Sequence, residues 1–395
     1  MMPSISRAAA GVPLSRAVAN RRKADELAAR GIAIVDFGMG EPDFDPPEPV
    51  VEAAIAALRA GESHYVDPRG LPALRERIAA FETQRHGHAV PAERVVVTSG
   101  SFCALSIASR AILDPGDEVL IPEPFWGPYR NIVQLAGGVA VPVPGVATQG
   151  RFSFDPERLR ALTGPRTRAI VINSPNNPTG RVFTREELTV VAELAEARNL
   201  WIVADEVYSE LVYDGHRHVS IASLAPAIAD RTIVINSFSK TWAMTGWRLG
   251  YCVARPEAAE AMARINHYTV RCATSFVQHA AVAAYESGWP DVERMVAAYA
   301  RRRRLVTERM ARLPGIRFTA PEGAFYAFPE LPAAWGDGEA VTRRWLEEAG
   351  VVVSAGGAYG PSAAQFLRLS FATSDAAIVE GFDRIDRLIA GGKPY

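Results

Sequence analysis

Short runs of apolar, often β-branched residues recur through the middle of the chain, and longer stretches with helical spacing separate them. Each run is almost continuously apolar, which is typical of a strand buried on both faces of a sheet. The alternation of such strands with helices predicts an α/β fold with a mostly parallel sheet. The seven predicted strands are Arg94–Thr98, Glu118–Pro122, Val139–Val143, Arg168–Asn173, Trp201–Asp205, Thr232–Asn236 and Leu249–Val253.

After about residue 285 the pattern changes to shorter strand–helix units that follow a long helix rich in arginine. We therefore predict a large α/β domain at residues 47–285 and a smaller α+β domain formed by residues 1–46 and 286–395. We interpret the arginine run Arg301–Arg304 as a solvated helix face. The predicted helices are Val50–Ala60, Leu71–His86, Phe102–Leu113, Arg185–Arg198 and Asp291–Arg312, and the later units are Gly323–Phe328, Glu339–Gly350, Val351–Ser354, Phe366–Ala372 and Asp375–Ala390.

Composition limits the class of protein only broadly. The 395 residues suffice for two domains, and 48% hydrophobic with 22% charged residues is an ordinary globular balance. The net charge of −1 gives no reason to expect nucleic acid, and no apolar stretch has the length of a membrane span. The N-terminus shows no secretory signal. Because Cys103, Cys252 and Cys272 are widely spaced, we expect a cytoplasmic protein without disulfides or a metal site.

Lys240 has the most informative surroundings in the chain. It follows the predicted strand Thr232–Asn236, with Ser237 and Ser239 before it and Arg248 after it. A lysine in this setting can hold an aldehyde cofactor as a Schiff base while hydroxyl groups and a forked guanidinium bind a phosphate. An ordinary loop lysine is the alternative interpretation of Lys240 alone.

Polar residues that could complete such a site end two neighbouring predicted strands. Asp205 ends Trp201–Asp205, and ligands of open α/β sheets bind at the carboxyl ends of strands. A carboxylate there can keep a pyridine ring nitrogen protonated, which makes the ring an electron sink. Tyr208 could donate to a ring oxygen. The alternative for Asp205 is a helix cap. The segment Asn173–Gly180 combines turn residues with amide side chains that could bind a carboxylate.

Three further features suit an anionic or aromatic ligand. Ser101 and Phe102 open a helix after a Gly/Ser turn, where free N–H groups can bind phosphate, although helix capping explains the turn equally well. Trp126 could stack on a flat ring or be a core residue. Arg368 lies inside an apolar strand, so it requires an anionic partner, which is either a ligand or a structural carboxylate.

Together these residues resemble the class I/II aminotransferases, which are pyridoxal-phosphate enzymes of fold type I. The resemblance is collinear from about Asp36 to Thr373 and is strongest to the bacterial aspartate/aromatic branch. The motifs that carry it are Gly40–Phe44, Asn173–Gly180, Asp205–Tyr208, Ser237–Lys240, Gly246–Arg248, Gly323–Tyr326 and Arg368.

The resemblance implies a role for each matching residue near the cofactor ring. Lys240 would form the Schiff base with pyridoxal 5′-phosphate, and Asp205 would pair with the pyridine nitrogen. Tyr208 and Asn177 would bond the phenolic oxygen of the ring, and Trp126 would stack on its face.

The phosphate and the substrate would be held by other matching positions. Ser101, the backbone N–H of Phe102, Ser237 and Arg248 would bind the phosphate. Tyr65 would reach the phosphate of a partner subunit, which implies a homodimer with shared sites. The residues implied for the substrate are Gly40, Asn177 and Arg368, which would bind the α-carboxylate, and Arg271, which would bind a distal carboxylate across the dimer.

The activity implied is transfer of the amino group of an L-amino acid to a 2-oxo acid by ping-pong kinetics, with glutamate or aspartate as donor. The phosphate turn departs from close relatives, because Phe102 stands where they often carry lysine. A surface arginine is the alternative for Arg271. A pyridoxal-phosphate β-lyase or an enzyme of secondary metabolism would reuse the same residues. A cofactor-binding transcription regulator would need a DNA-binding module, and the residues before Asp36 show no such pattern.

Overall fold

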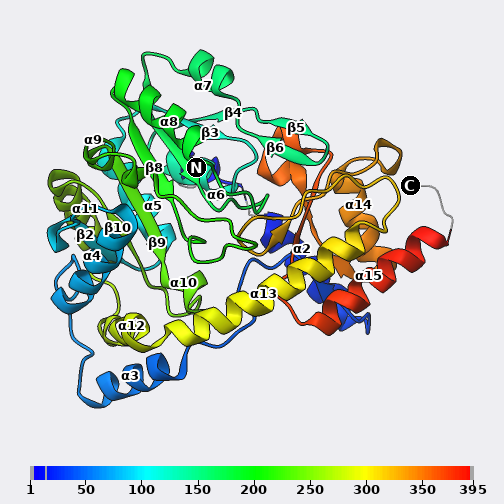
Figure 1. The fold of residues 1–395 in the computed structure, drawn as a ribbon, viewed down its shortest axis with the longest axis horizontal. Coiled ribbons are helices and arrows are strands. Elements are labelled where there is room, and N and C mark those ends of the chain that lie inside the picture. The colour runs from blue at the N-terminus through cyan, green and yellow to red at the C-terminus, as the bar shows by residue number, and fades with distance from the viewer. Residues whose placement is uncertain (1–3, 14–15, 392–395) are drawn as a thin grey trace.

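A computed structural model describes residues 4–13 and 16–391 of the chain. Its centre is a seven-stranded sheet in the order β2–β10–β9–β8–β7–β3–β4, with helices on both faces (Figure 1). The structure confirms all seven predicted strands, with ends that differ by one residue at most. They are β2 (Val95–Thr98), β3 (Glu118–Pro122), β4 (Val139–Val143), β7 (Thr167–Asn173), β8 (Trp201–Asp205), β9 (Thr232–Ser237) and β10 (Gly250–Val253).

The sheet is mostly parallel, as the apolar strand pattern predicts. Strands β4, β3, β7, β8 and β9 pair in parallel, whereas β10 runs antiparallel to both of its neighbours. Asn173 and Asp205 are paired across β7 and β8, and Ser237 ends β9 next to them. The carboxyl ends of these three strands therefore present polar side chains at one edge of the sheet, the edge where α/β proteins bind ligands.

Helices pack on each face through separate apolar clusters. One face packs against α5 (Ser101–Ile112), α6 (Pro128–Leu135) and α11 (Pro256–Val270). The other packs against α3 (Glu48–Arg59), α4 (Pro72–His86), α8 (Arg185–Ala197) and α12 (Ser275–Ser287). Of these, α3, α4, α5 and α8 confirm predicted helices, whereas α6, α11 and α12 were not predicted. The remaining elements of this region are α7 (Pro156–Leu162), α9 (Pro226–Asp230), α10 (Phe238–Thr241) and the hairpin β5 (Val146–Thr148) with β6 (Arg151–Ser153).

The N-terminal and C-terminal parts of the chain meet in one small sheet, and the C-terminal part forms a second small sheet by itself. Strand β1 (Val35–Asp36) pairs in parallel with β12 (Val351–Val352). Strands β11 (Tyr326–Ala327), β14 (Leu367–Ser370) and β13 (Ser354–Ala355) form an antiparallel sheet. The predicted strand Val351–Ser354 is thus divided between two sheets. The helices here are α1 (Arg7–Ala10), α2 (Arg16–Ala29), α13 (Trp289–Met310), α14 (Gly338–Arg344), which continues as a π-helical turn over Trp345–Ala349, and α15 (Asp375–Ala390).

The predicted domain boundaries at 47 and 285 stay a prediction, and residues 1–3, 14–15 and 392–395 of the predicted small domain lie outside the described residues. Figure 1 shows α13 running from the side of the large sheet toward α14 and α15. This helix therefore spans the two parts of the fold that the domain prediction separates.

The prediction of a solvated face at Arg301–Arg304 is wrong for two of the four arginines. Arg301 and Arg304 are exposed, but Arg302 and Arg303 are buried. Arg303 Nη1 donates to Asp214 Oδ2 at 2.5 Å, and Arg302 is paired with two aspartates. Buried arginines are stable only when paired, and the acidic partners of Arg302 and Arg303 are distant in sequence. The run of four arginines therefore did not reveal which of them are buried.

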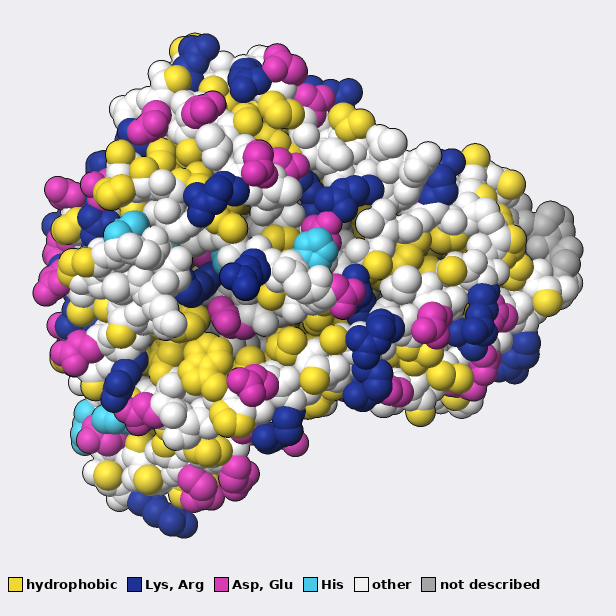
Figure 2. All heavy atoms as spheres, in the orientation of Figure 1, with side chains coloured by type: hydrophobic (Ala, Val, Ile, Leu, Met, Phe, Trp, Pro, Cys, Tyr) yellow, Lys and Arg dark blue, Asp and Glu magenta, His cyan; other side chains and the backbone are white. Residues whose placement is uncertain are grey.

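No helix in the described part of the chain has the length and apolar character needed to cross a bilayer. Figure 2 shows acidic and basic side chains interspersed over the face that it presents. This mixture agrees with a net charge of −1.

Candidate active site

Asp205 lies at the carboxyl end of β8 and is only 3% exposed. Its Oδ2 accepts a hydrogen bond of 2.6 Å from the hydroxyl of Tyr129 on α6, and its Oδ1 accepts one of 3.3 Å from Val207 N. The second contact lies in a turn at residues 207–210, and among the described residues no helix follows β8 directly, so the helix-cap alternative for Asp205 is wrong. Burial raises the pKa of Asp205 to about 6, because desolvation disfavours the ionised carboxylate. A cation placed beside this carboxylate would reverse that effect.

Lys240 lies on the short helix α10, directly after β9, so it projects from the strand beside that of Asp205. Its Nζ donates to Gly40 O at 2.5 Å and lies 6.0 Å from the ring centroid of Tyr208. Burial lowers the pKa of Lys240 to about 8. A substantial fraction of this amine is therefore neutral near pH 8, as a nucleophile or general base requires.

The amino end of α5 and Arg248 form a concave set of donors. Gly100 precedes the helix with φ +81°, and no side chain caps the free N–H groups that follow at Ser101 and Phe102. A Cβ on Gly100 would lie 2.4 Å from Arg248 Nη2, so only glycine allows the guanidinium to lie against this turn. Ser237, which ends β9, donates to Leu249 O at 3.3 Å. This combination suits a phosphate.

Two aromatic side chains border that donor set. Phe102 is 47% exposed, and its ring lies 4.6 Å from that of Trp126 with an interplanar angle of 72°. Trp126 also packs edge-on against Tyr129, at 5.3 Å between centroids. Trp126 is thus held between two rings near Asp205, in a position from which it could cover a flat ligand.

Arg368 on β14 meets residues from two distant segments. Its Nη2 donates to Gly38 O at 2.5 Å and its Nη1 to Asn177 Oδ1 at 3.1 Å, and both acceptors are neutral. Its Nε is buried and has no hydrogen-bond partner among the described residues. Its guanidinium carbon lies 4.5 Å from the ring centroid of Tyr326. A buried cation with neutral partners and a free donor is a ready site for a carboxylate.

The backbone near Gly40 approaches this cluster closely. A Cβ on Gly40 would lie 2.5 Å from the hydroxyl oxygen of Tyr326. That hydroxyl is 2.8 Å from the hydroxyl of Tyr208. The structure therefore brings Gly40, Asn177 and Arg368 together with Tyr208 and Lys240, as the sequence predicts.

Three contributors to this region were not predicted from the sequence. Tyr129 was not singled out, although it follows Trp126 by three residues and starts a helix with Pro128. Tyr326 was noted only as a family marker, and Gly38 not at all. Each acts through a contact between segments that are far apart in the chain, so local sequence pattern could not reveal it.

Tyr65 and Arg271 lie apart from the other predicted site residues. Tyr65 is 78% exposed, and the guanidinium carbon of Arg271 lies 5.2 Å above its ring. Arg271 Nη1 also contacts His267 at 2.9 Å. Among the described residues, neither side chain contacts Lys240 or Arg368. The predicted roles of Tyr65 and Arg271 across a subunit interface stay predictions.

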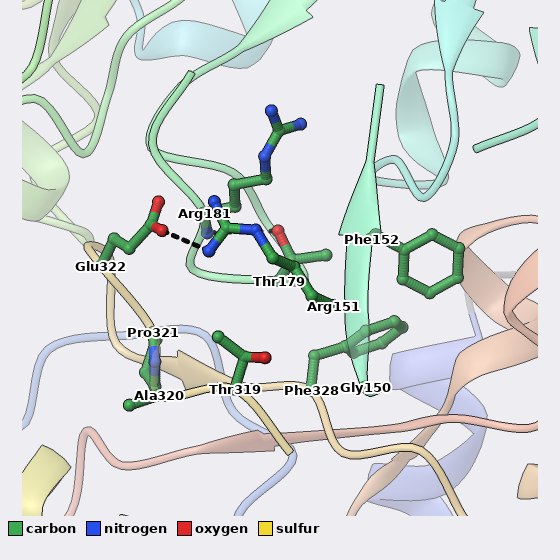
Figure 3. A pocket seen from close by; sticks show the side chains of 10 residues that line it. All are labelled: Gly150, Arg151, Phe152, Thr179, Arg181, Thr319, Ala320, Pro321, Glu322 and Phe328. Atoms are coloured by element: carbon green, nitrogen blue, oxygen red, sulfur yellow. Dashed lines mark hydrogen bonds and ion pairs between the residues drawn. The ribbon is translucent and has the colours of Figure 1, made fainter. Parts of the chain in front are cut away.

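A separate hollow of about 330 Å³, open to solvent, is lined by residues of the β5–β6 hairpin, of the turn after Asn177 and of the segment 319–322 (Figure 3). Arg151 reaches across it from β6 to Glu322, with 2.7 Å between Nη1 and Oε1. Thr179 and Phe328 belong to its lining. Because its charged groups are already paired, this hollow offers less to an anion than the cluster around Arg368.

Comparisons with known proteins agree with this geometry. A family model described as aminotransferase class I and II matches residues 32–385. An arginine–pyruvate transaminase from Pseudomonas aeruginosa is 42% identical over 356 residues, which is 90% of each chain. An aspartate aminotransferase from Geobacillus stearothermophilus is 38% identical over 390 residues, or 98% of each chain. The solved structure of the Thermus thermophilus aspartate aminotransferase with maleate has a TM-score of 0.92 and 38% identity, and the match covers 98% of this chain and 100% of that one.

Proposed function

This chain belongs to the class I and II aminotransferase family, and from that premise we propose that it transfers the amino group of an L-amino acid to a 2-oxo acid with pyridoxal 5′-phosphate held at Lys240. One observation carries the proposal. A buried carboxylate, Asp205, and a partly buried amine of lowered pKa, Lys240, come from adjacent strands to one site that also holds a free arginine donor.

The donors around the site fit this cofactor. Asp205 is a buried carboxylate whose ionised form needs a cation, and a protonated pyridine nitrogen supplies one. The uncapped start of α5, with Ser101, Phe102 N–H, Ser237 and Arg248, would hold the phosphate dianion. Trp126 would cover the pyridine ring. Tyr208 and Asn177 would bond the phenolic oxygen of that ring.

When bound, pyridoxal phosphate supplies an aldehyde for the amine and a ring that accepts the electron pair of the α-carbon. Ionised Asp205 would keep the ring nitrogen protonated. Lys240 Nζ would take the α-proton of the amino acid and return a proton in the reverse half of the cycle. Arg368, Gly40 and Asn177 would bind the α-carboxylate and so orient the bond to the α-proton.

We propose glutamate or aspartate as the amino donor. Relatives named aspartate aminotransferases support this choice, whereas the arginine–pyruvate transaminase shows that similar chains are named for another donor. Arg271 of a partner subunit would bind the distal carboxylate. Its position over the exposed Tyr65 supports a place at a subunit interface.

The experiment is a half-reaction screen. Loaded protein is mixed with each amino acid in turn, without a 2-oxo acid, and the visible absorption of the cofactor is followed. We expect rapid bleaching with glutamate or aspartate. If other amino acids bleach the band and neither of these two does, the proposed donor and the role of Arg271 are wrong. If no amino acid bleaches it, the proposed cofactor chemistry is wrong.

We also propose a homodimer with shared sites in a reducing, cytoplasmic setting. Tyr65 and Tyr268, which are 78% and 88% exposed, support the first part, because such large exposed aromatic residues are frequent at interfaces. Three free cysteines support the second part. Sedimentation equilibrium of wild type and Tyr268→Glu tests the interface. We expect a dimer that the charge weakens, and a monomeric wild type would contradict the proposal.

Tyr129→Phe is expected to lower kcat by about tenfold, because a hydrogen bond to a charged group contributes about 1.5–3 kcal/mol. The bond from Tyr129 favours ionised Asp205. Its loss should therefore move the acid limb of the kcat–pH profile to higher pH. The measurement is kcat between pH 5 and pH 9, with Tyr213→Phe as a matched control, since the buried Tyr213 hydroxyl bonds to Ala324 O instead. An unshifted profile for Tyr129→Phe would show that the bond does not tune Asp205.

A further inference from the structure

Arg302 lies at the centre of a cluster that the proposed reaction does not use. It is on α13 and is 7% exposed. Its Nη1 donates to Asp43 Oδ1 at 2.7 Å and its Nε to Asp375 Oδ1 at 3.2 Å. Its guanidinium carbon lies 5.2 Å from the ring centroid of Phe44 and 5.6 Å from that of Tyr299. Two carboxylates and two aromatic rings thus fix this side chain.

These contacts join three segments that are distant in the chain. Asp43 and Phe44 belong to the loop after β1, and Asp43 is 259 residues from Arg302. Asp375 is the first residue of α15, and Tyr299 lies one turn earlier on α13. The cluster therefore fastens the loop after β1 to two helices of the C-terminal region. Tyr299 reinforces it, because its hydroxyl lies 3.4 Å from Asp43 Oδ1.

The loop that Arg302 fastens is the one that borders the substrate end of the site. Gly38 O accepts from Arg368 Nη2, and Gly40 O accepts from Lys240 Nζ. Gly40 has no free space on its Cβ side, since Tyr326 fills it. Only two residues separate Gly40 from Asp43, and one residue spans at most about 3.6 Å. Because this connection is short, we expect a shift of Asp43 by a few ångströms to move Gly40 as well.

We propose that Arg302 is a positioning residue for substrate binding: by holding Asp43 and Phe44, it fixes the loop from Gly38 to Phe44 against Arg368. It touches no reacting atom and acts through that loop. The effect on substrate affinity rests on the proposed function of Arg368 and Gly40 as the α-carboxylate site. The effect on the loop itself does not depend on that function.

Arginine is suited to this position in a way that lysine is not. Its planar fork donates to two carboxylates at once, from Nη1 and Nε, and its flat face packs on aromatic rings. A lysine at the same place keeps the charge but can satisfy the two aspartates and the two rings only in part. Arg302→Lys should therefore have the same effect as Arg302→Met, only smaller.

The neighbouring residue provides a matched control. Arg301 also pairs with Asp375, at 2.9 Å from Nε to Oδ2, but it is exposed and no contact with Asp43 is present. Arg301→Met removes an arginine from the same helix and the same aspartate without releasing the loop. Asp43→Asn is the second test variant, because it replaces the charged acceptor on the loop side by a neutral amide oxygen, which binds the guanidinium more weakly, and it leaves Arg302 paired with Asp375.

The first experiment is hydrogen exchange of the loop amides in the cofactor-free protein. We expect exchange at residues 38–44 to be about tenfold faster or more in Arg302→Met and Asp43→Asn, intermediate in Arg302→Lys, and unchanged in Arg301→Met. Equal exchange in wild type and in both Asp43→Asn and Arg302→Lys would overturn the proposal. This outcome is decisive even if Arg302→Met fails to fold.

The second experiment separates KM from kcat in the loaded enzyme, with the donor that the half-reaction screen identifies. We expect Asp43→Asn and Arg302→Lys to raise KM by about tenfold while kcat changes less than threefold, because the loop binds ground state and transition state alike. A merely structural role would lower kcat through loss of folded enzyme and leave KM unchanged, and that result would overturn the proposal. Arg368→Gln must also raise KM; if it does not, the proposed carboxylate site is wrong, and the exchange experiment still decides the role of Arg302 in the loop.

Discussion

Lys240→Ala is expected to reduce turnover on the order of 10⁴-fold or more, because one change removes both the covalent attachment of the cofactor and the base that moves the α-proton. Lys240 Nζ donates to Gly40 O, a backbone carbonyl that cannot act as a base, and it lies 6.0 Å from the ring centroid of Tyr208. Burial raises the pKa of the Tyr208 hydroxyl well above its ordinary range, so that hydroxyl does not act as a base near neutral pH.

The measurements for Lys240→Ala are steady-state turnover and the visible spectrum of protein mixed with the cofactor. Lys23→Ala, which removes an exposed lysine from α2, is the control and should behave as wild type. Loss of turnover with retention of cofactor affinity at the phosphate donors is the expected pattern. Turnover within about tenfold of wild type would remove Lys240 from the mechanism.

A second substitution, Lys240→Met, should raise the stability of the cofactor-free protein. Burial lowers the pKa of Lys240 from an ordinary 10.5 to about 8, so the cost of burying the ammonium is in force below pH 8. As pH rises from 8 toward 10.5, the unfolded chain also loses its proton and this cost disappears. Cofactor-free Lys240→Met should therefore be more stable than wild type by about 1–3 kcal/mol at pH 7, with a difference that shrinks above pH 8. Chemical denaturation at pH 7 and pH 10 measures it.

Asp205→Asn is expected to lower kcat on the order of 10³-fold, because a neutral amide cannot hold the ring nitrogen in its protonated form and the electron sink is lost. Cofactor affinity should fall less, since the phosphate donors at α5 and Arg248 are untouched. Asn173→Asp, at the paired position on the neighbouring strand, places a charge near but not at the site. The visible absorption spectrum of the cofactor bound to Asn173→Asp should therefore differ from that of the cofactor bound to Asp205→Asn.

The stability of cofactor-free Asp205→Asn provides an independent check. Burial raises the pKa of Asp205 from 3.8 to about 6, so the ionised carboxylate destabilises the folded state above pH 6. That cost is relieved as pH falls from 6 toward 4, where the folded state takes up a proton before the unfolded chain does. The variant should be more stable than wild type by about 1–3 kcal/mol at pH 8 and equal to it near pH 4. Full activity together with unchanged stability would contradict the role given to Asp205.

The strands and the strand-end residues could be predicted because their signal is local. A run such as Trp201–Asp205 is apolar until its last residue, and parallel strands place their carboxyl ends together. Helix α12 was missed, because it is rich in alanine and shows only a weak polar–apolar alternation. The C-terminal strands are two to four residues long, which is too short for a reliable pattern.

The contacts that cross the fold could not be predicted from one sequence. Tyr129 reaches Asp205 across 76 positions, and Arg302 reaches Asp43 across 259. Nothing local distinguishes the buried Arg302 and Arg303 from the exposed Arg301 and Arg304 except their spacing on the helix. The roles of Arg271 and Tyr65 were predicted, but only through the family resemblance. It assigns both residues to the site of a partner subunit, and both lie at the surface of this subunit.

The most direct test of the central claim is a single turnover with a ¹⁵N-labelled amino acid at one equivalent per loaded site. We expect one equivalent of the matching 2-oxo acid to be released and the label to remain in the amine form of the bound cofactor. Addition of a different 2-oxo acid should then move the label into a new amino acid. Release of labelled ammonia, with the cofactor left in its aldehyde form, would contradict an aminotransferase and indicate a lyase.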